Sequence, residues 1–177
     1  MKLPFLEPTK IFIACILAAV VYGIAHDMFT AHLCVEYFSV FHPPVFNTDS
    51  PTLLALGWGV IATWWAGGII GAPLALVSRS GSRPKLTVRD LMRPIAILLA
   101  VMGACALLSG VIGYLWGPIP EDVAQTLPVY EHRRFVADMW AHSASYLIGF
   151  LGGIVLCFLA YRMRLRKAKT EQRILPL

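Results

Sequence analysis

Histidine and carboxylate side chains recur at one-turn spacing in two distant segments of this sequence. His32 is followed four residues later by Glu36, and Asp138 is followed four residues later by His142. Residues four apart lie on the same face of a helix, so each segment presents one imidazole beside one carboxylate. Imidazole and carboxylate ligands without thiolates suit zinc, iron, manganese or copper. If the two segments meet, the sequence therefore predicts a transition-metal site.

Further polar residues flank these two pairs and extend the predicted site. Ionisable groups within an apolar segment are costly, so we expect them to face the interior of a bundle and to pair there. The candidate metal ligands are His26, His32, Glu36, Asp138 and His142. The candidates for orienting those ligands through hydrogen bonds are Asp27, Thr30, Glu131 and Tyr146.

The composition places the chain in a membrane. Of its 177 residues 58% are hydrophobic and 14% are charged, with a mean hydropathy of +0.68. Soluble domains have about 45–50% apolar and about 25% charged residues, and disordered segments carry more charge still. The net charge of +5 comes from basic residues that flank apolar runs, which favours lipid over nucleic acid as the partner. We therefore expect an integral membrane protein whose partner is the lipid bilayer.

Four apolar segments are long enough to cross a membrane, which needs about 20 residues of helix. Three of them cover 52–77, 95–117 and 139–161. The fourth is predicted to run as one helix over 11–41, before two consecutive prolines. Such a helix has about 31 residues and a length of about 46 Å, more than the bilayer requires. We expect one all-α domain over 1–177, folded as a four-helix transmembrane bundle.

The basic residues are distributed unequally between the two ends of this bundle. Of the fifteen Lys and Arg residues, only Arg133 and Arg134 lie outside the two termini and the 78–94 connection. The positive-inside rule therefore places both termini and that connection in the cytoplasm. All five histidines and seven of the ten acidic residues then lie in the opposite half. We expect a His/carboxylate pocket that opens on the periplasmic side.

Other functions stay open for the same residues. The His and acidic groups could pair or carry protons in a transporter, or in an accessory or assembly subunit of a membrane complex, with a partner protein or a second copy of the chain. Haem b is an alternative cofactor if His26 or His32 faces His142. A disulfide-exchange mechanism is excluded, because no two of the four cysteines lie within ten residues of each other. Whether the chain is an enzyme stays open.

Four short motifs run through the apolar part of the chain. They are His26-Asp27-x-x-Thr30, Glu36-Tyr37-Phe38, Ala62-Thr63-Trp64-Trp65 and His142-x-x-Ser145-Tyr146. On these motifs the chain resembles an uncharacterised group of small bacterial multi-pass membrane proteins. The resemblance implies a bacterial inner (cytoplasmic) membrane and no particular activity. It puts less weight on His32 than on His26, Asp27, Glu36 and His142.

The resemblance raises a question about the first helix. On an unbroken helix His26 and Glu36 would lie about 15 Å apart, too far to bind one ion together. Either the helix breaks or the two residues act at different depths.

Overall fold

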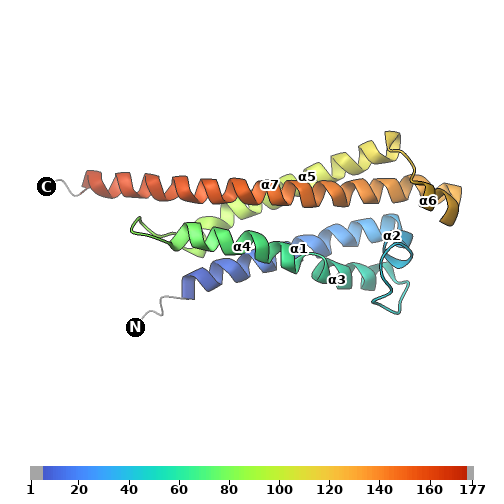
Figure 1. The fold of residues 1–177 in the computed structure, drawn as a ribbon, viewed down its shortest axis with the longest axis horizontal. Helices are drawn as coiled ribbons and strands as arrows, with labels where there is room; N and C mark the ends of the chain where they lie inside the picture. The colour runs from blue at the N-terminus through green and yellow to red at the C-terminus, as the bar shows by residue number, and fades with distance from the viewer. Residues whose placement is uncertain (1–5, 175–177) are drawn as a thin grey trace.

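The computed structural model describes residues 6–174 and the side chains up to residue 172. It is built of helices, with no strand among the described residues (Figure 1). Within residues 6–174, four stretches are long and apolar enough to cross a membrane, which confirms the predicted all-α four-helix transmembrane bundle. The long helices are α1 (Leu6–Leu33), α3 (Pro51–Ile61) with α4 (Trp64–Arg79), α5 (Val88–Trp116) and α7 (Val129–Ile174), and the short ones are α2 (Val35–Ser39) and α6 (Glu121–Thr126).

The bundle consists of two tightly packed groups of helices. α1 packs against α3 and α4, α5 packs against α7, and α2 and α6 lie together at one end of the molecule (Figure 1). Glycine allows the close approach within each group, because a Cβ on Gly67 would lie 2.7 Å from the Cys15 carbonyl oxygen and one on Gly113 would lie 2.7 Å from the Trp140 side chain. Such contacts through small residues are typical of helix pairs in membranes.

Two transmembrane helices are longer than the apolar runs that predict them. α5 starts at Val88 instead of residue 95, because Thr87 and Asp90 form a capping box in which the Thr87 backbone N–H donates a 2.7 Å hydrogen bond to the Asp90 carboxylate. α7 starts directly after Pro128 instead of at residue 139 and continues past residue 161 to Ile174. Both helices therefore continue beyond their apolar segments, through stretches that contain charged residues.

The first transmembrane helix breaks, and the prediction of one continuous helix over 11–41 is wrong. α1 ends at Leu33, Cys34 has an extended backbone (φ −149°, ψ 92°), and α2 follows. The break turns Phe38 inward to a core that includes Trp58. Burying one Phe side chain is worth about 1.5–3 kcal/mol, which favours this turn over a straight helix that projects out of the bundle.

The second crossing also breaks, so the predicted span over 52–77 consists of two helices. At the break the Thr63 hydroxyl donates to the Gly59 carbonyl, and the Tyr146 hydroxyl on α7 donates a 3.0 Å hydrogen bond to the Ala62 carbonyl. A carbonyl released from a helix within lipid needs such a partner. The break thus places polar groups inside the bundle, opposite α7.

Candidate functional site

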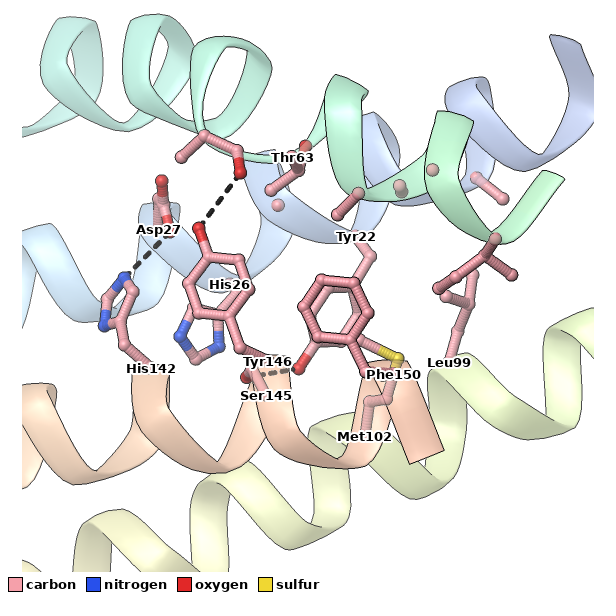
Figure 2. A pocket seen from close by; sticks show the side chains of 18 of the residues that line it. Tyr22, His26, Asp27, Thr63, Leu99, Met102, His142, Ser145, Tyr146 and Phe150 are labelled. Atoms are coloured by element: carbon pink, nitrogen blue, oxygen red, sulfur yellow. Dashed lines mark hydrogen bonds and ion pairs between the residues drawn. The ribbon is translucent and has the colours of Figure 1, made fainter. Parts of the chain in front are cut away.

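A hydrogen bond between α1 and α7 joins the two segments that carry the predicted site. His142 Nε2 on α7 lies 3.3 Å from Asp27 Oδ1 on α1, 115 residues away in the sequence. Figure 2 shows the two side chains pointing toward each other between the helices. Asp27 is buried and His142 is largely buried. The opening and closing segments therefore meet through an imidazole and a carboxylate.

Asp138 supports His142 from the opposite side of its ring. Its carboxylate Oδ1 lies 2.7 Å from His142 Nδ1, and its side chain is fully buried, with 0% exposed. The two residues are one turn apart on α7, which is the spacing that predicts the pair. His142 Nδ1 shares a 3.0 Å hydrogen bond with the Asp138 backbone carbonyl oxygen and lies beside the Asp138 carboxylate, so Nε2 is the nitrogen that faces α1.

His26 completes a group of three potential metal ligands. Its ring contacts the His142 ring edge to face, with 4.6 Å between the centroids, and it stacks on Tyr22. One ligand atom each from His26, Asp27 and His142 lies within 4.8 Å of the others. His26 Nε2 is buried and has no hydrogen-bond partner among the described residues. We refer to His26, Asp27, Asp138 and His142 as the His–Asp cluster.

The charges of the His–Asp cluster are not balanced by its own neutral imidazoles. If both carboxylates are ionised and both histidines neutral, two negative charges lie inside an apolar bundle, which is costly. A proton on His142 offsets one of them. A divalent cation offsets both, so the cluster is suited to hold either protons or a metal ion.

Aromatic side chains that follow the α1 break cover the His–Asp cluster. The Tyr37 ring stacks on His142 with 4.7 Å between centroids, and Phe38 meets the same ring edge to face at 5.6 Å. Behind them His42 packs on Tyr37 and Trp58, and its Nδ1 lies 2.7 Å from the Tyr37 carbonyl oxygen. Burial raises the pKa of the Tyr37 hydroxyl, which therefore stays protonated. This cover shields the cluster from water.

Sequence reasoning did not assign these aromatic residues to the site. The Glu36-Tyr37-Phe38 motif contains two of them, and the prolines after His42 indicate a turn that could bring the segment back over the bundle.

His32 does not join the His–Asp cluster, contrary to the sequence prediction. Its side chain is exposed, with Nδ1 2.7 Å from the Met28 carbonyl oxygen and Nε2 3.3 Å from the Thr52 hydroxyl. The reason is helix geometry: six residues after His26, His32 lies about 120° away around α1. Thr30 also bonds within α1, because its hydroxyl donates to the His26 carbonyl at 3.2 Å.

Glu36 lies in a second cluster instead of facing His142. The break at Cys34 turns Glu36 toward Glu131 near the start of α7, and one ligand atom from each of the three residues lies within 4.8 Å of the others. The Cys34 thiol lies 3.6 Å from the Glu36 carboxylate. Glu131, predicted to support the metal site, is buried and pairs with Arg134 at 3.2 Å. We refer to Cys34, Glu36 and Glu131 as the Cys–Glu cluster.

Tyr146, also predicted to support the site, bonds the Ala62 carbonyl and not a member of the His–Asp cluster. One turn of α7 away from His142, Ser145 shares a 2.8 Å hydrogen bond with the Tyr22 hydroxyl. Figure 2 shows these hydroxyl groups beside His26, so they line the interior next to the cluster.

Comparisons with protein-family models, curated proteins and solved structures gave no match to this chain. The fold and the site thus define it as a multi-pass membrane protein with a buried His–Asp cluster that could hold a metal.

Proposed function

We propose that this chain binds one transition metal ion through His26, Asp27 and His142. The observation that carries the proposal is the contact of Asp138 with His142 Nδ1, which leaves Nε2 of that ring facing Asp27. In metal sites, a carboxylate on the distal nitrogen of a histidine ligand fixes its tautomer and strengthens it as a ligand. The unpartnered Nε2 of His26 supplies the second imidazole.

Two imidazoles and one carboxylate favour zinc or iron(II) among the metals considered. Three protein ligands leave coordination positions open, so a bound ion would act as a Lewis acid or a redox centre. The edge-to-face contact of His26 and His142 does not suit haem b, because axial histidines lie on opposite faces of the porphyrin.

The setting we propose is a bacterial inner membrane, with both termini in the cytoplasm and the His–Asp cluster in the periplasmic half. The support is the concentration of Lys and Arg at the opposite end of the bundle, which the positive-inside rule assigns to the cytoplasm.

Metal content of the purified protein tests the proposal. The protein is purified in mild detergent, loaded in turn with zinc, iron(II), manganese and copper, desalted, and analysed by mass spectrometry of the elements. We expect about one ion per chain for zinc or iron(II), and a loss of nearly all of it in His142→Ala. His32→Ala is the matched control, because it removes an exposed histidine of the same helix bundle.

Size-exclusion chromatography and circular dichroism show whether the variants are folded like the parent protein, and metal content is compared only for variants that are. Wild-type protein that retains none of the four metals would contradict the proposal. Equal metal content in His142→Ala and wild type would contradict the assignment to this cluster.

A proton-linked transport role is the second candidate, because His142 lies between two buried carboxylates, Asp27 and Asp138. Proton flux into liposomes by metal-free protein, abolished in Asp27→Asn, is the result that this role predicts.

A further inference from the structure

A cavity extends from the His–Asp cluster into the centre of the bundle. Its volume is about 130 Å³, and it lies between the α1/α3/α4 group and the α5/α7 group. His26, Asp27 and His142 form its polar end, and apolar side chains such as Leu99 and Phe150 line the rest (Figure 2). An apolar cavity of about 150 Å³ admits benzene, so the volume of this cavity is close to that of one six-membered ring.

A groove on the lipid-facing surface of the bundle lies beside this cavity. It has a volume of about 520 Å³, runs between α1 and α5, and shares Tyr22 and His26 with the cavity. Phe29 and Leu107 line it and are 64% and 60% exposed, so the groove opens where lipid tails would contact the protein. A molecule dissolved in the membrane could therefore reach His26 without crossing water.

The lining residues restrict the head group of such a molecule. No Lys or Arg occurs among the described residues that line either space, and the cavity end carries the carboxylate of Asp27. A phosphate head group would be repelled there. The imidazole of His26 and the phenol of Tyr22 can each donate a hydrogen bond, so they suit a neutral ring that carries acceptor oxygens.

We propose that the cavity and groove bind a membrane quinone, a flat neutral ring with two carbonyl oxygens and one long apolar tail. The ring occupies the cavity beside His26, and the tail lies in the groove between α1 and α5. This binding does not require a metal ion in the His–Asp cluster, so it goes beyond the proposed metal site and can fail or hold independently of it.

Gly103 offers a variant that fills the groove without disturbing the cluster. A Cβ there would lie 3.9 Å from the Tyr22 ring, an ordinary contact, so a larger side chain would grow into the groove. Gly68 is the matched control. A Cβ at that position meets only the Phe12 ring at 3.7 Å, and the residue lines neither space.

The test measures binding of a decyl-tailed benzoquinone to the protein in nanodiscs, through quenching of tryptophan fluorescence, since Trp58 lines the cavity. We expect saturable binding by metal-free and metal-loaded protein, weakened about tenfold or more in Gly103→Leu, less in Gly103→Ala and not in Gly68→Leu. Metal content is expected to stay at the wild-type level in all three variants.

Absence of saturable binding, or equal affinity in Gly103→Leu and wild type, would overturn the quinone site. Loss of quinone binding when the nanodisc lipid is changed from phosphatidylcholine to phosphatidylethanolamine would also overturn it and indicate a phospholipid site. Quinone binding by wild-type protein that takes up no metal would support this site and contradict the metal proposal alone.

Discussion

The His–Asp cluster joins α1 to α7, and the Cys–Glu cluster joins the α1–α2 break and α2 to α7, yet their charges are compensated differently. In the Cys–Glu cluster, Glu131 already has a cationic partner in Arg134. In the His–Asp cluster, the ion-pair partner of both Asp27 and Asp138 is the single imidazole of His142. A buried carboxylate pair that shares one histidine leaves room for a further positive charge.

The two clusters also differ in their softer ligands. Burial raises the pKa of the Cys34 thiol to about 12, so a metal ion at this sulfur would have to displace a proton that is held more tightly than in an ordinary thiol. His26 and His142 would bind a metal ion as neutral imidazoles. Both clusters bring ligand atoms within 4.8 Å of one another, so the charge and protonation of those atoms distinguish them.

The largest expected effect is on metal affinity, when the carboxylate that each cluster takes from the first part of α7, Asp138 or Glu131, is neutralised. Asp138→Asn keeps the size of the side chain but removes the negative charge beside His142 Nδ1. We expect metal affinity to fall about 10–100-fold, the usual cost of losing such a partner. Competition with a chromophoric chelator measures this affinity.

Glu131→Gln is the matched control in the Cys–Glu cluster and is expected to leave the affinity unchanged. If the two variants lost affinity equally, the functional distinction between the clusters would be wrong.

A smaller effect is expected from chemical modification of Cys34. Because its pKa is raised from 9.0 to about 12, the reactive thiolate stays scarce as the pH rises from 7 to 9. Maleimide labelling of Cys34 in folded protein should therefore remain slow over this range, and a chelator should not speed it up. Peptide mass spectrometry follows the labelling, with detergent-denatured protein as the fully reactive reference.

Labelling of Cys34 that accelerates when a chelator is added would show that the Cys–Glu cluster holds metal, against this account.

The sequence was sufficient to predict the transmembrane helices, because each crossing is an apolar run of the necessary length. It did not reveal the breaks at Cys34 and Thr63, since neither position has a glycine or proline that would indicate one. The breaks depend on contacts made only in the folded bundle, such as the burial of Phe38 and the bond from Tyr146 to the Ala62 carbonyl.

The candidate site was predictable only in part, because local helix spacing predicts pairs within one helix but not contacts between helices. The pairing of Asp138 with His142 follows from one turn of helix and is confirmed. Local spacing also selects His32 and Glu36, but it carries no information on which helix face meets α7. The resemblance gave weight to His26, Asp27, Glu36 and His142. The structure brings His26 and Asp27 to His142, but it places Glu36 in the Cys–Glu cluster.

X-ray absorption spectroscopy of the metal-loaded protein tests the central claim most directly, because it reports the atoms bound to the ion. We predict nitrogen and oxygen neighbours at about 2.0–2.2 Å with the scattering pattern of imidazole, and no sulfur neighbour. A sulfur neighbour at about 2.3 Å would contradict the assignment to His26, Asp27 and His142.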